Sequence, residues 1–416
     1  MTAARIAKIR RPDTKSLDPT AVTIRNVKHL SSYNWIESPS PTIAVPGSPS
    51  LWSPPRGPQK VQKDSGLRYI AQNAARHPDS PLEPLFRALY ITHPSFDLGE
   101  VDLVTDRNNI RKILSFINPT LSKNGLEPFT IEVEVTNNNT AIFCRAETET
   151  FEFVEPHEFK GYGHEFEKAY TTNQVAGSTG HHRILSYRFS NLNLIVRYET
   201  DGYVGGSPSK APANETDTDT DTDPENDPLS GLMGSLSLRP PECVPCAASP
   251  RSRLLIKDEG QPVSTDSILE IKTRVARKPI HVQEVLPQLW ISETPKLVRA
   301  YHRNGGVFMD PQVEDVTPDI KRWEEAHQND LRGLAALIKT IINVARECGG
   351  YAIVKYADGG DHLGVWKAGG RRMLPDDLYT KLAPVETQKA DPADSQNLSV
   401  DKKTKGKGSK LSFLGM

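Results

Sequence analysis

The sequence contains little cysteine, no long apolar run and almost no net charge. Its 416 residues include four cysteines (Cys144, Cys243, Cys246 and Cys348), too few for a disulfide-built scaffold and typical of a reducing compartment. Cys243 and Cys246 have CxxC spacing, but no second Cys or His pair lies near them, so we expect no zinc site there. No apolar run is long enough to span a bilayer, and no secretory signal pattern opens the chain. We therefore expect a nuclear protein without a membrane partner, with the cytoplasm as the alternative.

A formal net charge of −1 identifies no partner, but the charges are unevenly distributed. Both ends of the chain are basic, and a Thr-Asp repeat in the middle is acidic. The basic ends either help to hold a polyanion or are simply solvated. Composition divides the chain into a disordered basic N-terminus, a catalytic domain in two parts, a disordered acidic and Pro/Ser-rich insert between them, and a disordered basic tail: residues 1–28, 29–204 with 265–385, 205–264, and 386–416.

Apolar spacing predicts both helices and strands in the two parts of the domain. Helices are expected at residues 80–90, from a cap at Thr105 or Asp106, and at 161–170, 281–291 and 331–347. Strands are expected at 129–136, 140–147, 182–189, 192–200, 296–302, 351–356 and 362–367. Because these elements do not alternate strictly, they predict an α+β fold with a mixed central β-sheet flanked by helices. Prolines and aromatics at 33–58 favour an extended segment on the domain surface.

Two short acidic signatures lie at the ends of apolar, β-branched runs. Glu199 and Asp201 end one run, and Glu270 and Lys272 follow another; within a strand, residues two apart share a face. Placing like charges together on a half-buried strand costs stability unless a cation offsets them. Together with Glu167, these carboxylates could hold Mg²⁺ or Mn²⁺, which prefer oxygen ligands, beside a lysine that offsets negative charge. Alone the signal is weak, since ordinary ion pairs explain most such pairs.

Five short motifs in order make the sequence resemble the decapping exoribonuclease (DXO-like) family, whose core is a PD-(D/E)xK-type nuclease fold. They are Leu103-Val-Thr-Asp-Arg107, Gly163-His-Glu-Phe-Glu167, Glu199-Thr-Asp201, Glu270-Ile-Lys272 with Thr273, and Gln288 seven residues before Pro295. The resemblance covers roughly residues 65–205 and 266–370. The chain departs from the family pattern in two places: Asn108 stands where the family usually has glycine, and the insert separates Asp201 from Glu270.

The resemblance implies a role for each residue of these motifs. Divalent metal would be bound by Glu167, Asp201 and Glu270, together with the backbone carbonyl of Ile271. Lys272 and Gln288 would position the attacking water or the scissile phosphate, Glu199 would lie at the edge of the site near metal-bound water, and Arg107 would contact substrate. The family removes pyrophosphate or incomplete caps from RNA 5′ ends, some members degrade RNA from 5′ to 3′, and some bind a 5′–3′ exoribonuclease.

We therefore expect an Mg²⁺- or Mn²⁺-dependent hydrolase of RNA 5′ ends that acts in RNA quality control, with decapping or pyrophosphohydrolase activity and an associated 5′–3′ exonuclease activity. Two alternatives stay open: a non-catalytic RNA-binding scaffold on the same fold, and a DNA nuclease. Three strand arginines (Arg183, Arg188 and Arg197) would either line a phosphate-tracking channel or be solvated.

Overall fold

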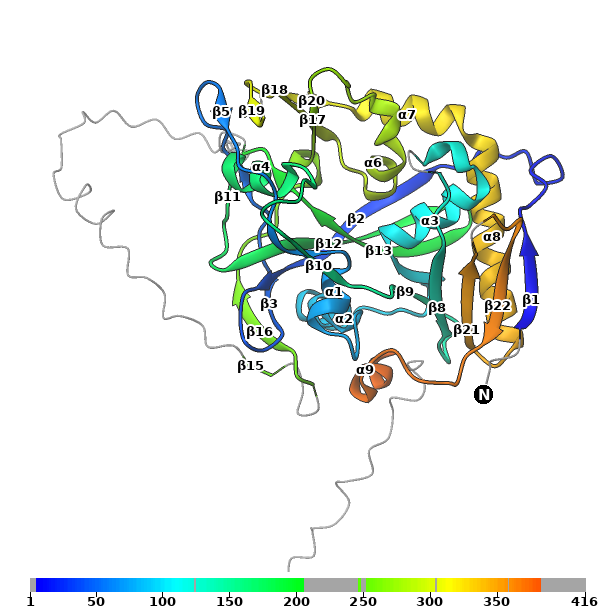
Figure 1. Ribbon diagram of the computed structural model, residues 1–416. Helices are drawn as coiled ribbons and strands as arrows, with labels where there is room; N and C mark the ends of the chain where they lie inside the picture. Colours follow the sequence, from blue (N-terminus) through cyan, green and yellow to red (C-terminus); the bar gives the residue numbers. More distant parts are fainter. Residues whose placement is uncertain are drawn as a thin grey trace, which may run out of the picture.

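The computed structural model describes residues 5–122, 125–205, 246–247, 252–303, 305–357 and 359–382 (Figure 1). The predicted basic tail, residues 386–416, and most of the predicted insert, residues 205–264, lie outside the described residues. Within the described part, no helix has the length and apolar character needed to cross a membrane.

A mixed sheet of 12 strands forms the centre of the fold. Its order is β1 (Arg5–Arg10), β22 (His362–Lys367), β21 (Tyr351–Tyr356), β8 (Phe129–Val135), β9 (Ala141–Ala146), β7 (Leu103–Asp106), β13 (Leu192–Thr200), β12 (Ser178–Phe189), β2 (Ile24–Ile36), β3 (Thr42–Pro46), β16 (Leu255–Glu259) and β15 (Cys246–Ala247). β7 pairs in parallel with both β13 and β9, whereas β12 pairs antiparallel with β13 and β2. The predicted α+β fold with a mixed central sheet is confirmed.

A smaller sheet of eight strands adjoins the large one. Its order is β11 (Thr171–Thr172), β4 (Leu51–Trp52), β14 (Gly202–Tyr203), β17 (Ile268–Val275), β18 (Lys296–Arg303), β19 (Val307–Phe308) and β5 (Gln59–Lys60), and β20 (Val313–Asp315) pairs with β18. A separate two-stranded sheet joins β6 (Gly66–Tyr69) and β10 (Phe151–Val154). Because β13 ends at Thr200 and β14 begins at Gly202, the chain passes from the large sheet to the smaller one at Asp201.

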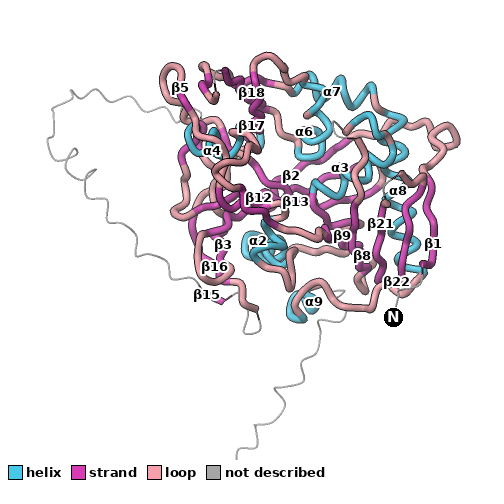
Figure 2. Tube along the Cα trace, in the orientation of Figure 1, coloured by secondary structure: helices cyan, strands magenta, loops and turns pink. Residues whose placement is uncertain are grey.

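Helices cover both faces of the large sheet (Figure 2). One face packs against α3 (Arg107–Ile117), α6 (Leu286–Ser292), α7 (Thr317–Ala326) and α8 (Gln328–Glu347), and the other against α2 (Glu83–Thr92) and α9 (Asp376–Lys381). α4 (Gly163–Tyr170) lies on the smaller sheet, and α1 (Gln72–Arg76) follows β6. Alternate side chains of one strand enter the two hydrophobic cores on opposite faces of the sheet. Leu194 and Val196 of β13 belong to the core with α3 and α8, whereas Ile195 belongs to the core with α2.

Three expectations from the sequence are wrong. Residues 1–28 are not disordered throughout, because β1 pairs with β22 and buries Ile9; the flanking basic residues hid this apolar position. The C-terminal part of the predicted insert forms β16, which pairs in parallel with β3. The segment predicted to lie on the surface contributes Tyr33 and Trp35 to a core, each 0% exposed, because β2 is an interior strand of the large sheet.

Candidate active site

The structure brings together all the side chains predicted for the site, and Glu270 lies at their centre. Glu270 is the third residue of β17 and is only 3% exposed. Its Oε1 accepts hydrogen bonds from Gln288 Nε2 of α6, at 2.5 Å, and from Lys272 Nζ. Its Oε2 lies 3.4 Å from Arg107 Nη1. The predicted common face of Glu270 and Lys272 is therefore confirmed, and three segments, α3, β17 and α6, meet at one carboxylate.

Arg107 opens α3 and reaches across the site. Its Nη1 donates to Ser292 Oγ at 3.2 Å, and its Nη2 donates to the backbone carbonyl of Glu199 at 3.3 Å. The guanidinium carbon lies 5.3 Å from the centre of the Tyr198 ring. A cation in the first turn of a helix opposes the helix dipole. The contacts with Glu270, Tyr198 and Ser292 hold Arg107 there in spite of this cost.

Asp201 and Glu167 are close enough for each to disfavour the charge on the other. Asp201 Oδ2 accepts the backbone N–H of Ile271 at 2.7 Å, so the tip of β13 is tied to β17. Burial, and then repulsion from Glu270, raise the pKa of Asp201 to about 7. Burial in the cleft, and then the charge of Asp201, raise the pKa of Glu167 well above its usual value. About a third of the Glu167 side chain remains exposed, so the carboxylate lies at the mouth of the site.

The pKa values of Glu270 and Lys272 are shifted in the directions that favour the charged forms of both side chains. Burial acts to raise the pKa of Glu270, but the charges of Lys272 and Arg107 outweigh it and lower that pKa. For Lys272, burial acts to lower the pKa, and the charges of Glu270 and Asp201 raise it instead. Glu270 and Lys272 therefore stay ionised as a pair at neutral pH, whereas Asp201 and Glu167 are the carboxylates that take up protons.

The charge balance of the cluster bears on metal binding. Within the described part of the chain, no three His, Cys, Asp or Glu side chains are already arranged around one point as ligands of an ion. Among these residues, the Glu167 carboxylate accepts no hydrogen bond. His164 Nδ1 lies 3.8 Å from it, but burial lowers the pKa of His164 and so favours the uncharged ring. The pKa values of Asp201 and Glu167 are both raised, and a cation beside the two carboxylates would lower them.

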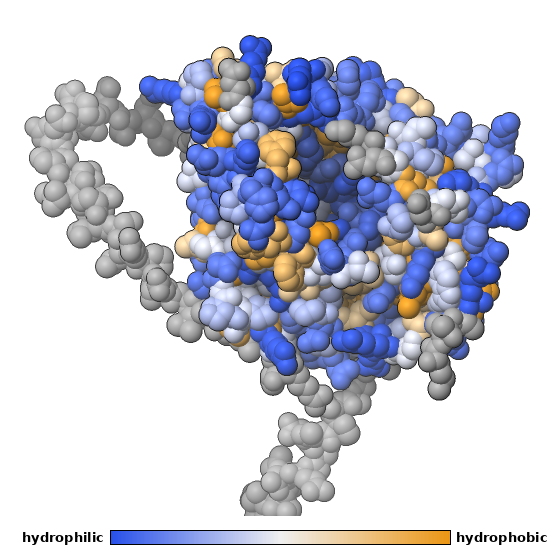
Figure 3. Space-filling model, in the orientation of Figure 1, coloured by the Kyte–Doolittle hydropathy of each residue, from blue (hydrophilic) through white to orange (hydrophobic). Residues whose placement is uncertain are grey.

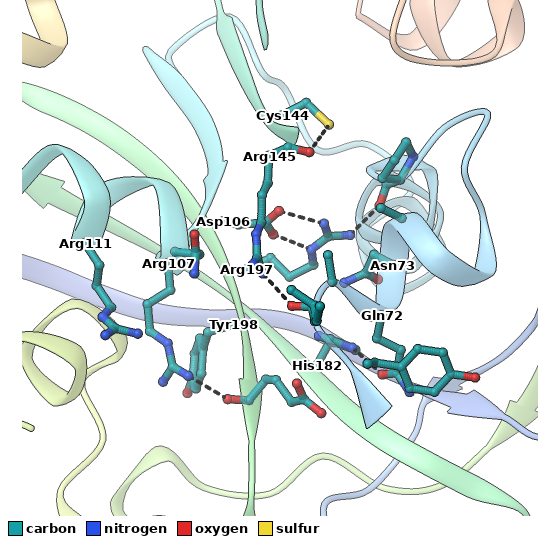
Figure 4. Close-up of a pocket in the computed structure, with 17 residues that line it drawn as sticks. Gln72, Asn73, Asp106, Arg107, Arg111, Cys144, Arg145, His182, Arg197 and Tyr198 are labelled. Carbon is teal, nitrogen blue, oxygen red and sulfur yellow. Dashed lines mark hydrogen bonds and ion pairs between the residues drawn. The ribbon is translucent and has the colours of Figure 1, made fainter. Parts of the chain in front are cut away.

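A cavity of about 150 Å³ adjoins Arg107 and Glu199 (Figure 4). Arg107 and Arg111 project into it from neighbouring turns of α3, and Arg145 of β9 contributes a third guanidinium. Arg145 is held by the Ile70 carbonyl at 2.9 Å and by Glu147. Arg111 is exposed and makes no hydrogen bond or ion pair with the described residues. Arg107 and Arg145 are paired with Glu270 and Glu147, so Arg111 is the guanidinium of the three that is best placed to meet an anion.

Several residues that shape this region carry no signal in the sequence. Ser292 and Arg111 fall outside the motifs that point to the site. Arg145 lies in a predicted strand, but the sequence does not show on which face of the sheet its side chain lies. Of the three strand arginines, Arg188 is solvated, one of the two alternatives, and Arg183, 0% exposed, fits neither. Arg197 is 1% exposed and paired with Asp106, but it forms part of the cavity wall. Arg183 and Arg197 both belong to strand segments buried on both faces, a position that sequence alternation alone cannot reveal.

Solved structures that share this fold include Rai1 from two yeasts. Scheffersomyces stipitis Rai1 in complex with 3′-NADP⁺ and calcium has a TM-score of 0.55 at 11% sequence identity, over 90% of this chain and 99% of that one. Schizosaccharomyces pombe Rai1 in complex with 3′-FADP has a TM-score of 0.51 at 11% identity, over 87% of this chain and 99% of that one. The predicted resemblance is therefore confirmed at the level of the fold.

Sequence comparison adds one family. No curated protein matches the chain. Residues 5–382 match the family described as Domain of unknown function (DUF8563), which spans every element of the described fold from β1 to α9.

Proposed function

The chain belongs to the family Domain of unknown function (DUF8563), a name that assigns no activity, and we propose that it is a metal-dependent hydrolase of RNA 5′ ends. One observation carries the proposal. On a fold shared with Rai1, Glu167, Asp201 and Glu270 meet beside Lys272, and the Gln288 amide and the Arg107 guanidinium both reach Glu270. This is the set of groups that hydrolysis of a phosphate ester or anhydride requires.

The donor set fits a hard divalent cation. Carboxylates of Glu167, Asp201 and Glu270, with the backbone carbonyl of Ile271, are the oxygen ligands that Mg²⁺ and Mn²⁺ prefer. The raised pKa values of Glu167 and Asp201 give the reason for binding, because a cation would relieve their mutual repulsion. When bound, such an ion supplies a water of lowered pKa and neutralises charge on the phosphate. The Rai1 of S. stipitis was crystallised with calcium.

The protein's own groups provide orientation and charge. Lys272 and Gln288 donate to the same Glu270 oxygen, so both also lie within reach of a water or phosphate oxygen beside it. Lys272 stays protonated and would offset negative charge as the scissile bond breaks. Arg107, with its two guanidinium nitrogens already directed at the site, would hold a substrate phosphate. Glu199 presents its carboxylate at the edge, next to the cavity.

The scissile bond that we propose is a phosphoanhydride at an RNA 5′ end. The ligands named for the two Rai1 structures, 3′-NADP⁺ and 3′-FADP, both contain a pyrophosphate linkage. The arginine-lined cavity beside Arg107 offers the cationic surroundings that a 5′-triphosphate or cap would need. Further 5′–3′ exonuclease activity, a 5′–3′ exoribonuclease partner and a nuclear role in RNA quality control belong to the same proposal.

Turnover of defined RNA 5′ ends tests the proposal. Substrates are 20-nucleotide RNAs with a 5′-triphosphate, an unmethylated cap or a 5′-monophosphate, each with Mn²⁺ or Mg²⁺ and with EDTA. We expect wild type to release pyrophosphate, cap dinucleotide or mononucleotides, and Glu270→Ala to lower the rate by at least about a thousandfold. Glu325→Ala, which changes an exposed glutamate of α7, is the matched control and should retain full activity.

Two outcomes would contradict the proposal. RNA binding without turnover under every metal condition would favour the non-catalytic scaffold. Faster cleavage of single-stranded DNA than of RNA with the same 5′ end would favour the DNA nuclease.

A further inference from the structure

The two-stranded sheet of β6 and β10 carries an exposed apolar face. Leu67, Phe151 and Phe153 are 54%, 54% and 63% exposed, although most large apolar side chains of the chain are buried. Neither phenylalanine is packed against another aromatic ring of the described chain. Exposed apolar groups that gather on one face mark an interaction site, whereas single exposed side chains do not.

Strand register connects this face with the arginine-lined cavity. Phe153 pairs with Leu67 and Phe151 pairs with Tyr69, so all four side chains project from the same face of the sheet. Tyr69 also lines the cavity beside Arg107 and Glu199. The apolar face therefore runs from solvent at Phe153 to the cavity at Tyr69. On the side of the molecule drawn in Figure 3, apolar side chains likewise border a hydrophilic hollow.

One cation lies over an exposed aromatic ring in the segment between β10 and α4, and others line the cavity. Lys63 Nζ lies 5.8 Å from the centre of the Phe159 ring, which is itself 59% exposed. At the inner end the face meets Arg107, Arg111 and Arg145 in the cavity. Arg111 makes no hydrogen bond or ion pair with the described residues, although its charge acts on Glu270. Exposed aromatic rings that lead to guanidinium groups are the elements of a surface for single-stranded nucleic acid, in which bases stack and phosphates meet positive charge.

We propose that the β6–β10 face is a stacking platform on which single-stranded RNA lies as its 5′ end enters the cavity. Bases would stack on Phe151 and Phe153, and the phosphates nearest the 5′ end would meet Arg111. This inference rests on the proposed function and gives it a substrate class: RNA with an unpaired segment several nucleotides long at its 5′ end. A protein partner would bury the apolar face equally well, but it would not explain why the face continues into a cavity lined by arginines, as RNA does.

Length-dependent RNA binding tests the platform without requiring turnover. Fluorescence anisotropy in EDTA measures the affinity of unstructured 5′-phosphorylated RNAs of 3 and 20 nucleotides. The double variant Phe151→Ala/Phe153→Ala should weaken binding of the 20-nucleotide RNA by about tenfold or more, because each stacked base contributes to affinity. Its effect on the trinucleotide should stay below about twofold, since the affinity of a trinucleotide rests mainly on its phosphates.

Two further variants separate stacking from general hydrophobicity and from misfolding. Phe151→Trp/Phe153→Trp keeps aromatic rings and should preserve or raise the affinity, whereas Phe151→Leu/Phe153→Leu should lose it as the alanine variant does. Ile91→Ala removes an apolar side chain of similar exposure, 48%, from α2 and should change nothing.

Several results would overturn the platform. One is equal affinity of wild type and the double alanine variant for the 20-nucleotide RNA. Another is an equal loss of affinity in the double leucine and double tryptophan variants. Self-association of wild type in sedimentation, abolished by the alanine variant while RNA affinity is unchanged, would assign the face to a second copy of the chain. Binding is measured in EDTA and is therefore independent of turnover. A length-dependent loss of RNA affinity in the alanine variant, together with no hydrolysis by wild type in the turnover assay with Mn²⁺ or Mg²⁺, would retain the platform and reject the enzyme.

Discussion

A single buried arginine fixes the start of α3 and so the position of Arg107. Arg197 forms a two-pronged ion pair with Asp106, with Nε–Oδ1 at 2.6 Å and Nη2–Oδ2 at 3.0 Å. Its remaining nitrogen, Nη1, donates to the Pro81 carbonyl and to Tyr33 Oη. Asp106 directly precedes Arg107 and is the N-cap residue of α3. The pair therefore couples an interior strand of the large sheet to the substrate side of the site.

Removing the Arg197 charge should destabilise the whole protein. We expect Arg197→Met to lower the free energy of unfolding by about 3–5 kcal/mol, because Asp106 then keeps a largely buried charge without a partner. Urea unfolding followed by tryptophan fluorescence measures the change. Arg188→Met, at an exposed position of the same sheet, should cost less than about 0.5 kcal/mol. Equal losses in the two variants would show that the ion pair contributes no more than a surface arginine.

At the scale of elements, local sequence patterns were sufficient to predict those helices and strands that form from the preferences of their own residues. The predicted strands at 351–356 and 362–367 agree with β21 and β22, and those at 129–136 and 140–147 agree with β8 and β9 to within one residue at each end. Asp106 was also predicted as a helix cap, and it holds that position. Its side chain, however, pairs with Arg197 instead of capping the helix, because a contact 91 residues away replaces a local one.

Features that depend on pairing between distant segments could not be predicted. β1 gains its stability from the edge of β22, and β16 from β3, so neither segment needs a strong pattern of its own. The site shows the same division. Sequence order and spacing indicated Glu167, Asp201 and Glu270, but the contact of Ser292 with Arg107 arises only when α6 packs against α3.

Gly202 illustrates an element whose position leaves no room for a side chain. It opens β14 directly after Asp201, and a Cβ there would lie 2.8 Å from the Ser50 carbonyl oxygen, a backbone atom. We expect Gly202→Ala to lower the free energy of unfolding by about 1–3 kcal/mol through overpacking, and to lower turnover because Asp201 shifts with it. Gly369→Ala, where no atom lies within 4 Å of the new Cβ, is the control for urea unfolding. An unchanged unfolding midpoint for Gly202→Ala would mean that β4 and β14 separate at no cost.

At the scale of the whole molecule, the site lies where the two sheets meet. β13 delivers Asp201 from the large sheet, and β17 delivers Glu270 and Lys272 from the smaller one. Gly202 pairs with Leu269, so the long segment between them leaves and returns at neighbouring strands. The cost of closing a loop grows only slowly with its length, which explains how the insert is compatible with an intact site. Activity should therefore depend on how the two sheets are held together.

A metal ion held by ligands from both sheets should link the two sheets and raise the thermal stability of the entire protein. A ligand at about 100 times its dissociation constant stabilises the folded state by about 2.7 kcal/mol, which for a chain of this length corresponds to a rise in Tm of about 3 °C. We expect Mn²⁺ to produce such a rise in wild type but not in Asp201→Asn. The pKa of Asp201 is raised to about 7, so at pH 6 a proton competes with the ion and at pH 8 it does not.

The rise in Tm should accordingly be larger at pH 8 than at pH 6, and differential scanning fluorimetry with and without Mn²⁺ at both pH values measures it. Glu325→Ala serves as the control, because its carboxylate lies on the exposed side of α7 and should leave both shifts unchanged. The same rise in wild type and Asp201→Asn would mean that Mn²⁺ binds elsewhere on the molecule. A rise that is independent of pH would mean that Asp201 is already ionised in the folded protein, and that Lys272 balances its charge without an ion.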